Sequence, residues 1–190
     1  MPEARSAMRA EPSEFSDLTP RSAPPASRPL MEATSRRLGF LPSAVARLAT
    51  SPRTLEAFTR MSAAFEATTL DPLARETVIM TVATRNDCRV CVLMHTRKLS
   101  ALGADEELVE ALRDGRRLPD ERLEAVRAFA LDVLDRAGDV DREVLDTFLG
   151  HGHTLEQALE VVLGIGAYTL STLANRLTGA PVDPQLEPRA

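Results

Sequence analysis

The chain has no tryptophan, one tyrosine and six phenylalanines, so aromatic residues make up only 4% of its 190 residues. Sandwiches and barrels draw heavily on aromatic and β-branched residues, whereas leucine, alanine and arginine, which are abundant here, favour helices. No segment alternates between polar and apolar residues for long enough to indicate a strand. The composition therefore predicts an all-α fold.

Several kinds of segment that would indicate other classes of protein are also missing. Two cysteines are too few, and too close together, for the disulfide framework of a small secreted protein. The first 30 residues lack the apolar core of a secretory signal, and the uncharged run at residues 161–175 is too short to span a bilayer. The formal net charge is -5, without a stripe of basic residues. These absences predict a cytoplasmic protein without nucleic-acid or membrane partners.

Proline is concentrated near the N-terminus. Residues 1–37 form a proline-rich segment, and prolines such as Pro25 and Pro29 predict that it lacks regular structure. The segment is either disordered or an arm that lies on a neighbouring subunit. Residues 38–183 are expected to form a single helical domain, because their length suits one hydrophobic core. Residues 184–190 are then a short tail.

Within that domain, apolar residues recur with helical spacing nearly throughout. The N-cap residues Ser51 and Asp71 each precede a proline, and Thr154 with Gln157 forms a capping-box pattern. The expected helices cover residues 42–50, 52–68, 72–86, 88–102, 105–115, 119–138, 140–149 and 154–178.

The last expected helix contains a run, residues 161–167, that is apolar on nearly every side. Such a run should be buried all round. It is expected to lie in the core, and a subunit interface could also cover it, because Gly164 and Gly166 would allow a close approach.

The residues that indicate chemistry are Cys88, Cys91 and His95. Cys91 follows Cys88 by three residues and precedes His95 by four, so all three side chains lie on one face of a helix. Asn86 or Asp87 is expected to cap this helix, which leaves Cys88 in its first turn.

A thiol has an ordinary pKa of about 8.5, and only its thiolate is a good nucleophile. The positive end of a helix dipole favours the anion, which by itself would make Cys88 the reactive residue. A neighbouring imidazole can take the proton of a thiol, which makes His95 a direct base for Cys91 one turn away. The spacing therefore predicts a redox-active Cys-x-x-Cys pair.

Other interpretations of the pair remain open at this point. Two cysteines three residues apart also occur in inert cores. A zinc site would need two more ligands, which His95, His151 and His153 could supply, but zinc pairs usually lie on turns. Haem attachment is excluded, because Val92 stands where that motif needs histidine. His151 and His153 look like a solvated polar turn.

Together with Glu76, which precedes Cys88 by twelve residues, the Cys88, Cys91 and His95 pattern resembles the alkylhydroperoxidase D-like branch of the carboxymuconolactone decarboxylase family. In that family a helix bearing glutamate is followed by a short polar break and then by Cys-x-x-Cys-x-x-x-His at the start of the next helix. The resemblance covers about residues 38–183.

This resemblance implies an all-helical bundle that assembles as trimers or hexamers and reduces hydroperoxides with its thiols, without a cofactor or metal. It implies that Cys91 reacts with the peroxide, that Cys88 is the resolving thiol, and that Glu76 and His95 relay the proton of Cys91. An external dithiol would then restore the pair. One position differs, because alkylhydroperoxidase D has a second histidine where this chain has Val90.

The sequence thus predicts a thiol-dependent hydroperoxide reductase or thiol-disulfide oxidoreductase that acts on a small hydroperoxide or disulfide. The alternative is a redox-sensing or scaffold protein in which the pair controls a homo-oligomer. A zinc-binding module and a lactone decarboxylase-like proton-transfer enzyme are weaker alternatives.

Overall fold

The structure is a computed structural model that describes residues 14–187. Within this range the chain forms nine α-helices and two short 3-10 helices, with no strand, so the predicted all-α fold is confirmed. The α-helices are α1 (Arg28–Leu38), α2 (Ser43–Leu48), α3 (Pro52–Glu66), α4 (Pro72–Arg85), α5 (Arg89–Ala101), α6 (Glu106–Asp114), α7 (Glu121–Asp135), α8 (Arg142–Gly150) and α9 (Leu155–Leu177). The 3-10 helices are η1 (Pro25–Ser27) and η2 (Pro184–Leu186).

Three helices begin where their capping residues predict. The side chain of Ser51 accepts a hydrogen bond from the N–H of Thr54 at the start of α3, and Asp71 does the same for α4. Thr154 and Gln157 form the reciprocal bonds of a capping box at α9. These starts are confirmed because a cap depends only on residues within one turn of helix.

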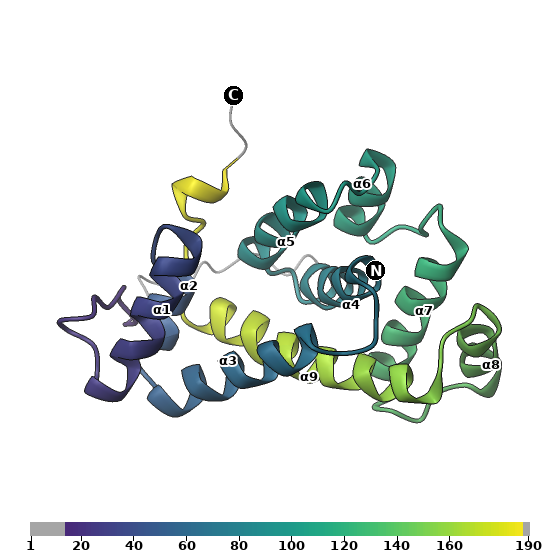
Figure 1. Cartoon of the computed structure of the whole chain (residues 1–190), viewed down its shortest axis with the longest axis horizontal. Coiled ribbons are helices and arrows are strands. Elements are labelled where there is room, and N and C mark those ends of the chain that lie inside the picture. The colour runs from purple at the N-terminus through teal and green to yellow at the C-terminus, as the bar shows by residue number, and fades with distance from the viewer. Residues whose placement is uncertain (1–13, 188–190) are drawn as a thin grey trace, which may run out of the picture.

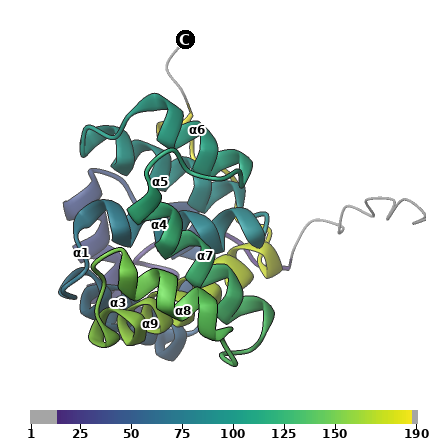
Figure 2. The ribbon, with the colours of Figure 1, turned by 90° about the vertical axis from the view of Figure 1, so that its right-hand side faces the viewer.

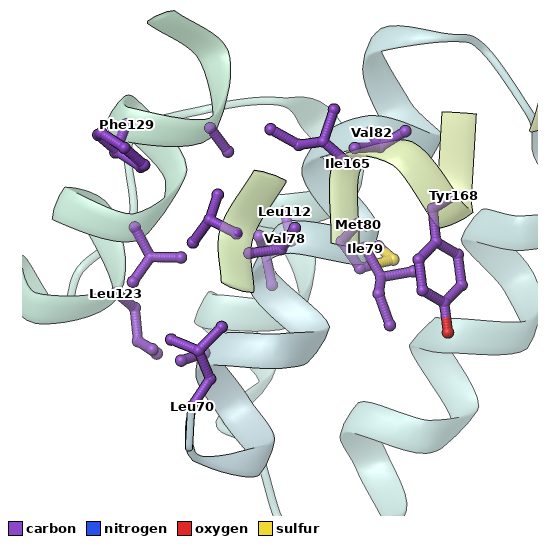
Figure 3. Close-up of a cluster of buried hydrophobic side chains, with 14 of the residues drawn as sticks. Leu70, Val78, Ile79, Met80, Val82, Leu112, Leu123, Phe129, Ile165 and Tyr168 are labelled. Carbon is purple, nitrogen blue, oxygen red and sulfur yellow. The ribbon is translucent and has the colours of Figure 1, made fainter. Parts of the chain in front are cut away.

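Helix α4 lies in the middle of the molecule. In Figures 1 and 2, α5 and α6 lie above it and α3 and α9 below it, while α7 packs on a third side. Every α4 residue from 76 to 83 is buried. Figure 3 shows Val78 and Ile79 of α4 among side chains from α6, α7 and α9. A single core therefore surrounds the helix that carries Glu76.

Helix α9 is only partly buried within the chain, so the core alone does not cover its apolar run on every side, and cover of the other side by a subunit interface stays a prediction. Val161 and Ile165 face the core, but Val162 is 46% exposed and Gly166 is also exposed. The uncharged run is too short to span a membrane, but the whole of α9, with 23 residues, is long and apolar enough to do so by length and composition. Its buried face nevertheless packs against α3, α4 and α7, which makes it a core helix of this bundle.

The described part of the proline-rich segment is not irregular, which corrects the prediction for residues 14–37. Pro25 begins η1 and Pro29 lies in the first turn of α1, where proline lacks no needed hydrogen bond. Met31 is fully buried, and the hydroxyl of Ser27 donates to the carbonyl of Ala49 at 2.8 Å. The segment thus packs on its own chain; residues 1–13 lie outside the described residues, and contact with another subunit stays a prediction.

The C-terminal segment is also ordered as far as it is described. Asp183 accepts hydrogen bonds from the backbone N–H and the hydroxyl of Ser43, at 3.0 and 2.8 Å. Leu186, within η2, is 6% exposed and packs in a cluster with Cys88 and Cys91. The residues expected to form a tail therefore cover the start of α5.

Candidate active site

The connection between α4 and α5 places the first cysteine at the helix start. Asp87 has a φ of 50°, a left-handed conformation that aspartate tolerates better than most residues. Cys88 is itself the N-cap residue of α5, and its N–H donates to the carbonyl of Ala83 at 2.9 Å. The prediction that Asn86 or Asp87 caps the helix was therefore wrong by one or two positions, because the chain reverses at Asp87.

The two sulfurs lie together in the interior. Cys88 Sγ and Cys91 Sγ are 3.1 Å apart, in hydrogen-bond contact, and the residues are only 3% and 5% exposed. Both are free thiols. A disulfide needs a separation of about 2.05 Å, so a small movement of the side chains would join them.

Two polar residues of α9 also contact the sulfurs. The side-chain amide of Asn175 donates to Cys91 Sγ at 3.3 Å and to Cys88 Sγ at 3.7 Å. The hydroxyl of Ser171 lies 4.0 Å from Cys91 Sγ. Sequence analysis missed both residues. The available signal was their spacing of four residues, which places both on one face of the helix, because a polar side chain on a buried face needs a partner.

The predicted glutamate and histidine also meet. Nδ1 of His95 lies 2.7 Å from Oε2 of Glu76, and both residues are buried. Lys98 Nζ forms an ion pair with the other oxygen, Oε1, at 2.9 Å. The ring of Tyr168 is edge-on to the imidazole, with centroids 5.4 Å apart. These contacts fix the orientation of the imidazole.

The charge of Glu76 is stabilised by this arrangement. Burial by itself would raise the pKa of Glu76, but the hydrogen bond with His95 and the positive charge of Lys98 outweigh it. The pKa of Glu76 is therefore below its usual value, and the carboxylate is ionised at neutral pH. Lys98 was not predicted; it also pairs with Glu66 on α3, which no local sequence pattern indicates.

The four predicted site residues thus form two pairs, Cys88 with Cys91 and Glu76 with His95. His95 lies one turn after Cys91 on α5, as the spacing predicts. Its hydrogen bond goes to Glu76, however, while the hydrogen bonds of the two sulfurs go to each other and to residues of α9. The expected direct contact between His95 and Cys91 is not among the hydrogen bonds of the described residues.

The sequence of residues 52–135 matches the model of the carboxymuconolactone decarboxylase family. The match contains Glu76, Cys88, Cys91 and His95, so the resemblance drawn from these four residues is confirmed.

Solved structures share the fold of this chain over almost its whole length. An uncharacterized peroxidase-related protein from Ralstonia eutropha JMP134, described as an alkylhydroperoxidase AhpD core, has a TM-score of 0.82 and 20% identity, covering 93% of this chain and 95% of its own. A peroxidase-related protein from Silicibacter sp. TM1040 has a TM-score of 0.77 and 20% identity, covering 95% and 97%. A variant of the debrominase Bmp8, in complex with 2,3,4-tribromopyrrole, has a TM-score of 0.73 and 17% identity, covering 94% and 95%. No curated protein matches significantly in sequence.

The electrostatics of the thiols bear on which family role each cysteine takes. The hydrogen bond from Cys91 lowers the pKa of Cys88 to about 6. The backbone N–H of Cys91, the Asn175 amide and the Arg176 charge act in the same direction, against the effect of burial. The same contact, together with burial, raises the pKa of Cys91. The anion of the dithiol form therefore resides on Cys88, as the position at the helix start suggests.

Of the two remaining histidines, His151 is exposed as expected, but His153 differs from its prediction. His153 is buried rather than solvated, because its ring stacks on Phe148 with centroids 4.4 Å apart. Its Nδ1 lies 3.2 Å from the side-chain oxygen of Gln157. Among residues 14–187, no group of three or more histidine, cysteine, aspartate or glutamate side chains is arranged to hold a metal ion.

Proposed function

We propose that the protein is a thiol-dependent hydroperoxide reductase or disulfide oxidoreductase whose Cys88–Cys91 pair alternates between dithiol and disulfide. The observation that carries this proposal is the 3.1 Å separation of two buried sulfurs at the start of α5. The lowered pKa of Cys88, whose thiolate can take the proton of Cys91, and the Glu76–His95 pair are further support, because reactive cysteines need an available thiolate and a route for protons. The peroxidase-related names of the two structural relatives agree with it.

The chemistry uses both sulfurs in turn. The proton shared across the 3.1 Å contact moves to Cys88, and the Cys91 thiolate attacks the outer oxygen of the hydroperoxide. The O–O bond breaks, Cys91 becomes a sulfenic acid, and the leaving alkoxide takes a proton from Cys88 to form the alcohol. The Cys88 thiolate then attacks the Cys91 sulfur, which forms the disulfide and releases hydroxide, which is protonated to water. An external dithiol reduces the disulfide by exchange and is itself oxidised.

We propose that the Glu76–His95 pair supplies protons to this reaction. The ionised Glu76 holds the imidazole by Nδ1, which leaves Nε2 to exchange protons with the reacting groups through a small movement or a water molecule. We propose that the pair returns protons to the alkoxide and hydroxide when the sulfurs cannot. Such chemistry needs reduced thiols, so we also propose a cytoplasmic location.

The surroundings of the sulfurs favour an apolar substrate. Leu186 is buried in the same cluster as the two cysteines, and Phe40, Met94 and Val182 pack against it. These apolar side chains thus form part of the surroundings of the pair. We therefore propose that an organic hydroperoxide reacts faster than hydrogen peroxide.

The proposal is tested by following the loss of cumene hydroperoxide in the presence of dithiothreitol, for the wild type and for Cys91→Ser and Cys88→Ser. Both variants should lose steady-state turnover. A sulfenic-acid probe with mass spectrometry should label Cys91 in Cys88→Ser and nothing in Cys91→Ser. Unchanged turnover in both variants would refute the proposed function, whereas label on Cys88 would instead exchange the roles of the two cysteines.

A redox-sensing oligomer is the second candidate, and the surface of α9 favours it. Leu155, Leu159, Leu173 and Leu177 are all more than half exposed along this one helix. Leucines in such a row are typical of an interface, and we propose that copies of the chain associate through it. Sedimentation of the reduced and the oxidised protein distinguishes the candidates, because a sensor changes its oligomeric state with oxidation and a simple reductase does not.

A further inference from the structure

Asn175 makes an unusual contact for a buried amide. It lies near the end of α9, is only 7% exposed, and its Nδ2 donates to both sulfurs of the pair, at 3.3 Å to Cys91 and 3.7 Å to Cys88. Neutral thiols and disulfides are weak hydrogen-bond acceptors, whereas a thiolate is a strong one. The contact is therefore much stronger when one of the two sulfurs carries a negative charge.

The position of this amide is fixed by bonds on both sides of it. Arg176, the next residue, donates to the carbonyl of Asp87 at 2.6 Å and to its carboxylate at 2.8 Å. One turn earlier, the hydroxyl of Thr172 accepts a hydrogen bond from the side chain of Asn86 at 2.9 Å. The end of α9 thus holds the loop that precedes Cys88. The amide does not have to move to reach the sulfurs, so little conformational entropy is lost when the thiolate forms.

We propose that Asn175 is a positioning residue that holds the anionic sulfur of the Cys88–Cys91 pair and so sets how readily the pair reacts and how easily its disulfide is reduced. The proposal deepens the proposed function, because it concerns the same two sulfurs. A donor that prefers the thiolate stabilises the dithiol form over the disulfide at neutral pH. Loss of the donor should therefore both lower the thiolate fraction and shift the equilibrium towards the disulfide.

The first measurement is the rate of alkylation by iodoacetamide against pH, with the modified cysteine identified by mass spectrometry. One hydrogen bond to a charged group corresponds to about one pKa unit. In Asn175→Ala the midpoint of the pH profile should rise by about one unit, so that the rate well below the midpoint falls about tenfold. Asn175→Asp keeps the size of the side chain and should raise the midpoint further, because a carboxylate repels the thiolate.

The second measurement is the equilibrium of the pair with reduced and oxidised glutathione. Asn175→Ala should hold the disulfide at a lower ratio of oxidised to reduced glutathione than the wild type does. Asn86→Ala is the matched control, since it loosens the same contact between α9 and the loop without touching either sulfur. It should shift the midpoint and the equilibrium much less than Asn175→Ala does, because Arg176 still holds the loop and the amide still faces the sulfurs.

Circular dichroism shows whether each variant is folded. If Asn175→Ala does not fold, the pH midpoint of Asn175→Asp alone tests whether Asn175 holds the anionic sulfur. A wild-type midpoint in a folded Asn175 variant would overturn the proposal, as would an equal shift in Asn86→Ala. Neither measurement needs peroxide turnover. A shifted midpoint in a protein that reduces no hydroperoxide would therefore keep the role of Asn175 and refute only the proposed function.

Discussion

Replacement of Gly164 by alanine tests how closely α9 packs against the centre of the bundle. A Cβ atom at this position would lie 2.6 Å from Cε2 and Cζ of Phe65 and 3.0 Å from Cγ1 of Val78. Both neighbours are fully buried, and the ring of Phe65 is further held by the edge of Tyr168. The ring cannot turn into solvent, so α9 or α3 must shift to admit the methyl group.

Two effects of opposite sign decide the magnitude. Alanine in place of glycine within a helix stabilises the folded state by about 1 kcal/mol. Overpacking of a well-filled core costs about 1–3 kcal/mol, and the 2.6 Å approach to a rigid ring belongs near the upper end of that range. We therefore expect Gly164→Ala to lower the free energy of unfolding by ~1–2 kcal/mol.

Gly166→Ala is a matched control two residues along the same helix. Its Cβ would meet only Cε of Met61, at 3.4 Å, and this is the flexible end of a partly buried side chain. The helix-propensity gain should then dominate and stabilise the protein by about 0.5–1 kcal/mol.

Urea unfolding, followed by circular dichroism at a concentration where all variants sediment alike, measures the difference. For a chain of this size, 1 kcal/mol corresponds to about 2–4 °C in Tm, so thermal melts should separate the two variants clearly. A Gly164→Ala protein as stable as Gly166→Ala would contradict the close packing of α9 against Phe65.

Three further predictions concern the thiols, the buried carboxylate and the exposed face of α9. The pH midpoint for alkylation of Cys88 should lie near 6 in the wild type and rise towards about 8.5 or above in Cys91→Ala, because the donor that lowers the pKa of Cys88 is removed; equal midpoints would contradict this. The lowered pKa of Glu76 contributes stability that is present above its unfolded pKa of about 4.5 and is lost as the pH falls through the folded value. Urea unfolding from pH 6 to pH 3 should accordingly show a shallower loss of stability in Glu76→Gln than in the wild type, and parallel curves would be inconsistent with the charge pairing. Leu159 is 73% exposed, so Leu159→Glu should weaken self-association measured by sedimentation. Leu102→Glu, which lies outside α9, should not weaken it. Equal self-association of the two variants would place the interface elsewhere.

Most of the local structure could be predicted from the sequence, because it depends on interactions within a few residues. The caps at Ser51, Asp71 and Thr154 and the shared face of Cys88 and Cys91 are of this kind. The meeting of Glu76 and His95 was implied by the family resemblance, and the packing of α4 against α5 brings it about.

The predictions that failed depended on contacts with distant parts of the chain. Composition alone made the prolines before residue 30 look incompatible with structure, whereas Pro25 and Pro29 occupy first turns on a surface formed by α2 and α3. His153 was predicted to lie in a solvated turn, but its ring stacks on Phe148, which the local sequence does not indicate. The run around Val162 was expected to lie mainly in the core, but only one side of it does, because apolar residues on a helix have the same sequence pattern whether they face the core or a subunit interface.

The sequence by itself determined the all-α class, several helix starts and the placing of two cysteines and a histidine on one helical face. Helical periodicity and capping are short-range effects, so a single stretch of chain encodes them. Only the tertiary structure decided that Asn175 and Lys98 belong to the site, and that Cys88 rather than Cys91 carries the anion. Those outcomes depend on which buried groups α9 and α5 bring within a few ångströms of one another, and hydrogen-bond strength and pKa respond to that distance and to burial, not to sequence separation.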